Sequence, residues 1–402
     1  MEILIHFFML FIAFYTLFTY AVSMLIRYYL KPLDVVRDFS KEPTVSVLLS
    51  AFNEGEAVYN TIKSLRYCNY PVNKLEIIAI DDRSPDNTYD WLKKAAKDFP
   101  NVIAKQNIAN QGKALTMLDA ANIASGEYIV GVDSDCIFKD DSIRQLMACF
   151  TEKNIGAVGG RVGISNINDS WICGIQAVFY MSSYYLMKTI ENLPRKIQCL
   201  SGPIVAIKKS LYLSLSNEIK GRTFLGAKIT NGEDRALTQM ILRKGYDTYV
   251  NIDAVCWTTC PTTISQYLKQ QLRWRRSAVG QWLEALYNLP TLLRNSSLSS
   301  AIFSLAPIYV VLAWNLMLLT SVASGNFLYI LVYILIFHML LGPLFAIGFL
   351  IVTRNNKIEK IDSPLNFIFS MVLASFWFPV SGFLLTLMAL ATLDDGGWVT
   401  RQ

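Results

Sequence analysis

The chain contains few of the residues that build structural metal sites or nucleic-acid surfaces. It has only two His in 402 residues and no Cys-x-x-Cys pair, which argues against the common structural zinc sites. Its seven Cys are spread along the sequence and are typical of free thiols in a reducing compartment. The net charge is only +6, and the Lys and Arg residues are scattered rather than gathered in stripes, which argues against binding to nucleic acid.

Charged residues are scarce and apolar residues are abundant. They make up 17% and 53% of the chain, a composition that indicates a membrane protein. Long apolar runs occupy residues 3–26, 298–321, 327–352 and 365–393, and each is long enough to span a bilayer. The first run has no basic stretch before it and no small-residue cleavage site after it, so we expect a retained anchor rather than a signal peptide. The lipid bilayer is therefore an expected partner.

Residues beside and inside these runs predict how they are oriented. Arg27, Lys31 and Arg37 follow the first run, and the positive-inside rule then places the next domain in the cytoplasm. The last run contains Pro379 and Gly382 near its middle. Because Pro and Gly permit a break between two half-helices, we expect a re-entrant hairpin that returns the C-terminal tail to the cytoplasm.

Between the first run and the later ones, the sequence alternates between strand and helix patterns. Apolar segments predict buried strands at residues 45–50, 75–80 and 128–132. The intervening helical patterns lie at residues 57–67, 87–98 and 113–124. This alternation predicts an α/β domain with a parallel sheet covered on both faces, and ligands of such sheets bind at the carboxyl ends of the strands.

Acidic residues follow two of these predicted strands. Asp82 ends the second strand, where its carboxylate offers charge-assisted hydrogen bonds to the ribose or base of a nucleotide; a simple polar turn explains the same residue. Asp133 and Asp135 follow the third strand, where two carboxylates offer hard oxygen ligands to Mg²⁺ or Mn²⁺. Asp-x-Asp is common by chance, and its position after an apolar strand is what favours a metal site.

Two further segments carry groups suited to sugar-nucleotide chemistry. Lys113 follows Gly112 at the start of a helix, where it offers a charge to phosphate or a donor to a base; a solvated Lys is the alternative. Glu233 and Asp234 precede a helix predicted at residues 236–242. Asp234 is the candidate general base that takes a proton from an acceptor hydroxyl, although two acids at a helix start also complement the helix dipole.

A basic and aromatic segment precedes the last apolar runs. Residues 264–289 have the pattern of amphipathic helices at a membrane surface. They contain Gln270, Arg273 and Trp274, of which the indole can stack on a sugar and the guanidinium can hold a diphosphate. An interfacial helix with an aromatic anchor accounts for the same residues.

The order of these motifs resembles that of family 2 glycosyltransferases. It is most similar to their processive membrane branch, which includes the hyaluronan, chitin, chitooligosaccharide and cellulose synthases. The shared order is Asp-Asp at a strand end, Asp-x-Asp, Glu-Asp and Gln-x-x-Arg-Trp ahead of apolar helices, and it extends from Val45 to Arg401. The resemblance implies an α/β GT-A glycosyltransferase domain inserted between transmembrane helices, with amphipathic interface helices. The implied parts are an anchor at 1–30, a catalytic domain at 44–255, interface helices at 256–297, a transmembrane bundle at 298–393 and a tail at 394–402.

The resemblance also implies an inverting, processive reaction on the cytoplasmic side of the plasma membrane. Asp82 and Lys113 would hold the uridine end of a UDP-sugar donor. Asp135, with Asp133 nearby, would bind the donor through Mg²⁺ or Mn²⁺. Asp234 would be the base.

Other positions acquire roles only through the resemblance. Arg273 would contact the diphosphate, and Trp274 would stack on the acceptor sugar. Ser201-Gly202-Pro203 resembles an acceptor-side loop, and the tail Trp398-Val-Thr-Arg401 resembles the Trp-Gly-Thr-Arg ending of hyaluronan synthases, with Val399 in place of Gly. The implied acceptor-binding residues are Gln270, Trp274, Ser201, Gly202, Pro203 and Glu233, and the tail would add Trp398 and Arg401 to the donor site.

Because Val399 replaces the Gly of the hyaluronan synthase tail, the sequence does not decide between a hyaluronan-type and a chitin-type product. Hyaluronan and chitin both contain N-acetylglucosamine, so UDP-N-acetylglucosamine is the expected donor, with or without UDP-glucuronic acid, and a growing polysaccharide is the acceptor. The alternative is a non-processive glycolipid glycosyltransferase with a ceramide or polyprenyl-phosphate acceptor. A transporter that only binds nucleotide is disfavoured, since no charge lies well inside a predicted span. The sequence does not predict the oligomeric state.

Overall fold

The computed structural model describes residues 35–224, 227–228, 232–287, 298–333, 336, 339 and 364–393. The predicted anchor at 3–26, most of the run at 327–352 and the C-terminal tail lie outside these residues. The described chain divides into two compact units, which we call the sheet unit and the helical unit. The sheet unit contains the described parts of Pro32–Gly163 and Glu191–Thr259, and the helical unit those of Ile164–Ile190 and Cys260–Leu393.

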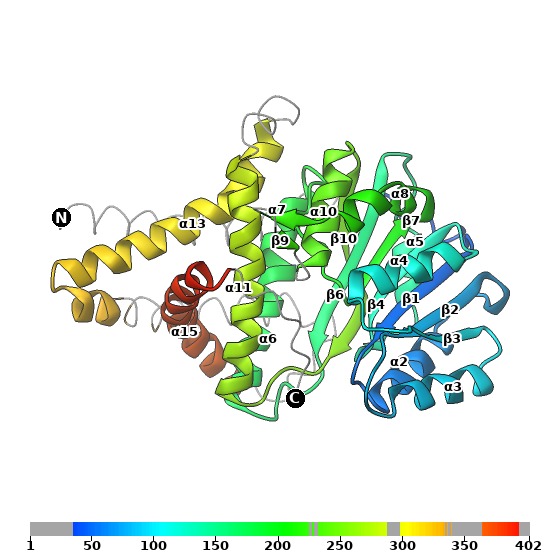
Figure 1. Ribbon diagram of the computed structural model, residues 1–402. Helices are drawn as coiled ribbons and strands as arrows, with labels where there is room; N and C mark the ends of the chain where they lie inside the picture. The colour runs from blue at the N-terminus through cyan, green and yellow to red at the C-terminus, as the bar shows by residue number, and fades with distance from the viewer. Residues whose placement is uncertain are drawn as a thin grey trace. The chain divides into compact units, whose positions relative to one another are not determined.

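An eight-stranded sheet forms the centre of the sheet unit as far as the structure describes it (Figure 1), with the strand order β3-β2-β1-β4-β7-β6-β10-β5. Its strands are β1 (Val45–Ala51), β2 (Leu75–Asp81), β3 (Val102–Gln106), β4 (Tyr128–Asp133), β5 (Ile137–Phe138), β6 (Ile155–Ile164), β7 (Ile204–Lys208) and β10 (Asp247–Thr258). A separate antiparallel pair is formed by β8 (Thr223–Phe224) and β9 (Ala227–Lys228).

The first half of the sheet agrees with the sequence analysis. β1, β2, β3 and β4 are parallel, and the three predicted strands match β1, β2 and β4 to within one residue. All seven residues of β1 are buried, as its nearly continuous apolar sequence predicts for a strand covered on both faces. The second half was not predicted: β7 runs antiparallel to both β4 and β6. The sheet is therefore mixed rather than wholly parallel.

Helices cover both faces of this sheet (Figure 1). α2 and α3 connect β1, β2 and β3 in one direction along the sheet, whereas α4 connects β3 back to β4. Because such crossovers are right-handed, α4 lies on the face opposite α2 and α3. The helices of the sheet unit are α2 (Ala57–Arg66), η2 (Val72–Lys74), α3 (Thr88–Asp98), α4 (Lys113–Ile123), α5 (Ser142–Met147), α8 (Lys209–Ser214), α9 (Ser216–Lys220) and α10 (Glu233–Arg243).

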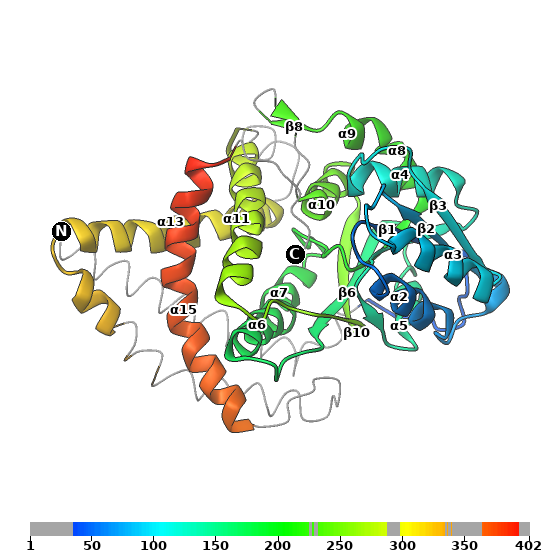
Figure 2. The same cartoon turned by 60° about the horizontal axis from the view of Figure 1, so that its bottom comes forward.

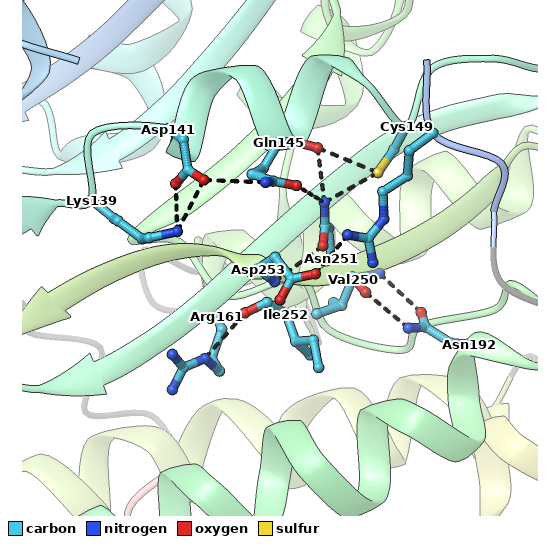
Figure 3. Close-up of polar contacts among 11 residues, drawn as sticks. Lys139, Asp141, Gln145, Cys149, Arg161, Asn192, Val250, Asn251, Ile252 and Asp253 are labelled. Atoms are coloured by element: carbon cyan, nitrogen blue, oxygen red, sulfur yellow. Dashed lines mark hydrogen bonds and ion pairs between the residues drawn. The ribbon is translucent and has the colours of Figure 1, made fainter. Parts of the chain in front are cut away.

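Side-chain hydrogen bonds fix the long strand β10 against its neighbours (Figure 3). The Nδ2 of Asn251 donates to the carbonyl oxygen of Gln145 in α5 at 2.8 Å. The Nε of buried Arg161 on β6 donates to the carbonyl oxygen of Ile252 at 3.2 Å. Buried backbone groups are thereby satisfied. These bonds hold the strand whose last residue, Thr258, contacts the candidate site.

The helical unit contains α6 (Trp171–Ser182), η3 (Ser183–Met187), α11 (Ile264–Tyr287), α13 (Leu298–Ala323) and α15 (Pro364–Ala391), and the short helix α7 (Lys188–Asn192) joins it to the sheet unit. α15 packs against both α6 and α11 (Figure 2). α11 confirms the helix expected over residues 264–289. The sequence analysis places the segment Ile164–Ile190 inside the catalytic domain at 44–255. In the structure this segment groups with the helical unit instead.

The described helices can be compared with two expectations about the apolar runs, the membrane spans and the re-entrant hairpin. None of the helices in the described part of the chain combines the length and the apolar character needed to cross a membrane. The re-entrant hairpin expected near Pro379 is wrong, because α15 continues as one helix from Pro364 to Ala391. A Pro removes one backbone donor and kinks a helix, and packing against neighbouring helices holds the turns on either side together.

Candidate active site

Residues from separate motifs meet at the carboxyl end of β4. Lys113 begins α4 and forms an ion pair with Asp133, the last residue of β4. The Nζ of Lys113 also lies 3.4 Å from Oε1 of Glu233, in the first turn of α10. All three side chains are partly buried, so water screens these attractions less than it would on the open surface. The predicted positions, Asp133 at the end of a strand and Lys113 and Glu233 at the starts of helices, are confirmed.

Gly202 lies at the centre of this group. A Cβ atom at this position would lie 3.2 Å from Nζ of Lys113, 3.7 Å from Oδ1 of Asp133 and 3.7 Å from Cβ of Asp234. The loop Ser201–Pro203 leads into β7, which pairs with β4, and this pairing brings the loop to the strand end. A glycine allows the backbone to approach the charged residues closely. The loop assigned to the acceptor side therefore adjoins the candidate base.

Asp234 is held by bonds to both of its carboxylate oxygens. Gly232 begins α10 in the left-handed conformation at φ 68°, which glycine adopts readily. Oδ1 of Asp234 accepts from the backbone N–H of Arg235 at 2.7 Å, and Oδ2 accepts from the backbone N–H of Gly202 at 3.4 Å. The hydroxyl of Thr238 donates to the Asp234 carbonyl at 2.7 Å. The carboxylate is thus oriented by the loop and by its own helix.

The charge balance at this position favours a protonated lysine. Burial by itself would lower the pKa of Lys113, but the attraction of Asp133, Glu233 and Asp234 outweighs it and raises the pKa well above the usual lysine value. The amine therefore remains a cation at any physiological pH. Among these four side chains the three carboxylates outnumber the one amine, which suits a further cation.

Asp135 lies in the turn after β4. Its Oδ2 accepts a hydrogen bond from Oγ1 of Thr258 at 3.1 Å, at the end of β10. Nothing in the sequence marks Thr258 as part of the site, because its position depends on the pairing of β5 with β10. In the described part of the chain no three His, Cys, Asp or Glu side chains gather as a complete metal site. Asp133 and Asp135 suit Mg²⁺ or Mn²⁺ as a partial set that phosphate and water oxygens complete, as Mg²⁺ commonly requires.

Asp82 has a structural role that the sequence did not indicate. It is fully buried, and its carboxylate accepts from the backbone N–H groups of Gln111 at 3.1 Å and Gly112 at 2.8 Å. The amide of Asn107 donates to the same carboxylate at 2.7 Å. These bonds shape the loop that delivers Lys113 to the site. The role of Asp82 in holding uridine stays a prediction.

A pocket opens beside the charged group, between α4, β4, β7 and α10. The empty space in it is about 860 Å³, a volume that includes open solvent at the mouth. Lys113, Glu233 and Asp234 line one part, and the remainder is mostly apolar. Apolar lining residues include Met117, Leu200, Val205, Tyr212, Leu237 and Ile241. The sequence patterns mark these positions only as core, so the pocket was missed.

The remaining predicted site residues are not brought to this group by the described sheet unit. Gln270, Arg273 and Trp274 lie on α11 in the helical unit, where the Trp274 ring makes an edge contact with Tyr180 at 6.3 Å between centroids. The tail residues near Trp398 and Arg401 lie outside the described residues. Their roles in donor and acceptor binding stay predictions.

Comparison with known proteins finds glycosyltransferases of similar sequence. Residues 46–215 match the family model described as glycosyl transferase family 2. An N-acetylglucosaminyltransferase from Rhizobium sp. (strain N33) is 30% identical over 279 residues, which cover 67% of this chain and 60% of that protein. A hyaluronan synthase from Streptococcus pyogenes serotype M1 is 25% identical over 371 residues, which cover 89% of this chain and 83% of that protein. The chain thus spans about three fifths of the length of the rhizobial relative.

A solved structure shares the fold. The mannosyltransferase PcManGT from Pyrobaculum calidifontis, in complex with GDP-Man and Mn²⁺, superposes with a TM-score of 0.57 at 18% identity. The match covers 94% of this chain and 99% of that one. At this identity the likeness concerns the fold, and it agrees with the GT-A fold expected for the sheet unit. Residues 46–215 thus form a domain that matches glycosyl transferase family 2.

Proposed function

We propose that this chain is an inverting β-glycosyltransferase that transfers N-acetylglucosamine from UDP-N-acetylglucosamine to the end of a growing polysaccharide. The observation that carries the proposal is the meeting of Lys113, Asp133, Gly202 and Asp234 at one strand end. The names of the relatives, an N-acetylglucosaminyltransferase and a hyaluronan synthase, support this donor and this kind of product.

Asp234 is the proposed general base. In the proposed step, an acceptor hydroxyl gives its proton to Asp234 while its oxygen forms a bond to the anomeric carbon of the donor. The bond from that carbon to the diphosphate breaks on the opposite side, and UDP leaves. Glu233, beside Asp234, is already paired with Lys113. A single available base agrees with a one-step displacement and inversion.

Asp133 and Asp135 are the proposed holders of a divalent cation, Mg²⁺ or Mn²⁺. When bound, the cation supplies positive charge that stabilises the departing diphosphate. Lys113 supplies a second, permanent positive charge beside Asp133. Its bonds to Asp133 and Glu233 also fix the direction of those side chains before the donor binds.

We further propose that the chain is an integral membrane protein and that it acts processively. Its catalytic domain would lie in the cytoplasm. This part is supported by the four apolar runs of the sequence and the basic residues after the first. Exposed apolar side chains on α13 and α15 also suit a lipid environment. Among them are Leu312, Leu316, Leu319, Phe369, Leu384 and Met388. Arg273 and Trp274 are the proposed diphosphate and acceptor contacts from α11.

The deciding experiment supplies the detergent-solubilised full chain with Mg²⁺ or Mn²⁺ and radiolabelled UDP-N-acetylglucosamine, alone and with UDP-glucuronic acid. A polymer made from the single donor and degraded by chitinase supports a chitin-type product. A long, hyaluronidase-sensitive polymer that requires both donors supports a hyaluronan-type product. Label found only in a lipid extract would overturn processive synthesis in favour of a glycolipid product, and no incorporation would overturn the proposed donor.

A further inference from the structure

The segment at residues 198–202, which precedes β7, runs alongside the start of α10. The backbone N–H of Leu200 donates to Oγ1 of Thr238 at 3.0 Å, and the backbone N–H of Gly202 donates to Oδ2 of Asp234 at 3.4 Å. Residues four apart in a helix lie on one face and are about 6 Å apart along the axis, a distance that two residues of chain can span. The segment is therefore bonded to one face of α10 at two successive turns.

The hydroxyl of Thr238 takes part in two hydrogen bonds at once. It donates to the carbonyl oxygen of Asp234 at 2.7 Å and accepts from the N–H of Leu200. A hydroxyl has one proton to donate, so its donation to Asp234 leaves its lone pairs for the segment. Thr238 is only 1% exposed and Leu200 only 2%, so water is poorly placed to replace a lost bond. An N–H left without an acceptor at such a position costs free energy.

Leu200 is held from its other side by the sheet. A Cβ atom added at Gly159 of β6 would lie 2.9 Å from Cδ2 of Leu200 and 3.7 Å from its Cβ. The side chain of Leu200 thus packs directly on this strand, while its N–H reaches α10. Leu200 and Thr238 also both line the pocket beside the charged group. The bond between them therefore sets the distance from the segment to α10.

Two neighbours of Leu200 contact the candidate base. Sγ of Cys199 lies 3.9 Å from Oδ2 of Asp234, and the N–H of Gly202 donates to the same oxygen at 3.4 Å. Both separations are at the long end for hydrogen bonds of their kind, so a small outward movement of the segment would remove them. The orientation of the carboxylate therefore depends on where Thr238 holds Leu200.

A threonine in another helix shows the simpler arrangement. Oγ1 of Thr320 donates to the carbonyl oxygen of Leu316 at 2.8 Å, within α13. Threonines in helices commonly make this bond to the carbonyl four residues back. Thr238 differs because a second element, the 198–202 segment, bonds to the same oxygen.

We propose that Thr238 is a positioning residue for sugar transfer. Its hydroxyl holds the 198–202 segment against α10 and so maintains the contacts of Cys199 and Gly202 with the carboxylate of Asp234. This role rests on the proposed function of Asp234 as the base. Thr238 takes no proton from the acceptor, because its hydroxyl already bonds the Asp234 carbonyl and the Leu200 N–H.

The positioning role predicts which kinetic constant changes. A displaced Gly202 N–H leaves the base poorly oriented, so kcat should decrease when the hydroxyl is lost. The proposed metal contact of Asp133 comes from the end of β4, which the loss of one hydroxyl on α10 leaves in place. The KM for the donor should therefore change little.

Two substitutions at Thr238 separate the hydroxyl from the shape of the side chain. Thr238→Val keeps the shape and removes the hydroxyl, so the Leu200 N–H and the Asp234 carbonyl lose this partner. Thr238→Ser keeps the hydroxyl and removes only a methyl group. Thr320→Val, which removes a hydroxyl bonded within α13, is the matched control.

The test measures initial rates of label transfer by the detergent-solubilised full chain over a range of UDP-N-acetylglucosamine concentrations. A second assay, without donor, follows the alkylation of Cys199 by iodoacetamide with mass spectrometry. All seven Cys lie within the described residues, and Cys199 is the one that is not buried. For Thr238→Val we expect a kcat lower by roughly 10- to 100-fold at a similar KM, and several-fold faster alkylation. Thr238→Ser and Thr320→Val should resemble the wild type in both assays.

The proposal is overturned if Thr238→Val keeps the wild-type kcat, if its Cys199 reacts no faster, or if Thr238→Ser fails to restore kcat. A parallel loss of kcat and donor affinity would also overturn it, since general damage to the fold has that effect. If Thr238→Val does not fold, Thr238→Cys, whose thiol is a weak donor and acceptor, replaces it and the same outcomes decide. Absence of transfer in the wild type would contradict the proposed function instead, and the alkylation rates would still test whether Thr238 holds the segment.

Discussion

The backbone N–H of Gly202 donates to Oδ2 of Asp234 at 3.4 Å, which joins the loop before β7 to the first turn of α10. The two residues belong to different motifs, and the antiparallel pairing of β4 with β7 brings them together beside Asp133. The acceptor-side loop therefore takes part in orienting the candidate base. The predictions below follow from this arrangement.

Replacing the candidate base should remove transfer and spare donor binding. Asp234→Asn keeps the shape of the side chain and its contact with the Arg235 N–H, but the amide cannot take a proton. We expect the transfer rate to fall by roughly 10²- to 10⁴-fold. Radiolabel incorporation measures the rate, and calorimetry measures UDP affinity. Asp90→Asn, at an exposed surface carboxylate, is the matched control. Near-normal turnover of Asp234→Asn would refute the assignment.

Adding one methyl group at Gly202 should disturb the site more than the fold. In Gly202→Ala the new Cβ lies 3.2 Å from Nζ of Lys113, so the amine must shift. We expect kcat to decrease by about 10- to 100-fold through misplacement of the charged groups. Gly280→Ala, where a Cβ meets nothing within 4 Å, is the control. If both variants retain equal activity, close approach at Gly202 is not required.

Removing the Lys113 charge should weaken donor binding and the fold together. Lys113→Met leaves Asp133 and Glu233 without their cation, and we expect a loss of about 1–3 kcal/mol in unfolding free energy, since the pair is only partly buried. UDP affinity should also decrease, as measured by calorimetry. A double-mutant cycle with Asp133→Asn should show coupling. Additive effects of the two changes would contradict a direct interaction.

The stabilisation by Lys113 should not titrate near neutral pH. Its pKa is raised in the folded state, so the charged amine stabilises the fold below the ordinary lysine pKa, and this contribution is lost only when pH rises through the raised value. The Tm difference between the wild type and Lys113→Met should therefore be the same at neutral and mildly alkaline pH. A difference that disappears in that interval would show that the amine is not held as a cation.

Loss of the Asp82 carboxylate should loosen the loop that leads to Lys113. Asp82→Ala leaves the backbone N–H groups of Gln111 and Gly112 without their acceptor, and because both residues are partly buried we expect a cost of about 1 kcal/mol for each hydrogen bond lost. Hydrogen exchange should accelerate at these two amides. Asp90→Ala should change neither exchange nor stability. Unchanged exchange in Asp82→Ala would show that the carboxylate does not order the loop.

Removal of divalent cations should stop transfer reversibly. Asp133 and Asp135 provide only part of a coordination shell, so a chelator should extract the ion readily and Mg²⁺ or Mn²⁺ should restore activity. Incorporation of label after dialysis against EDTA, with and without added metal, measures this. Full activity in the presence of EDTA would exclude the proposed metal role.

The sequence alone was sufficient for the local structure of β1, β2 and β4 and of the helices between β1 and β4. The apolar residues of β1 and β4 and the amphipathic patterns of α2, α3 and α4 place these elements to within about one residue, because parallel strands buried on both faces and helices buried on one face need those patterns. Asp133 and Asp234 were also named as candidate site residues, since strand ends and helix starts are where such sheets hold their ligands.

The tertiary structure decided everything that depends on pairing between distant segments. β7 pairs antiparallel with β4, and this places Gly202 against Lys113 and Asp234. No local pattern encodes that direction, because an apolar strand has the same periodicity in either orientation. The burial of Asp82 under its own loop and the gathering of Cys173 and Cys260 in one apolar cluster have the same origin. Local sequence sets which residues are strands, helices and charges, and only the packed fold determines which of them touch.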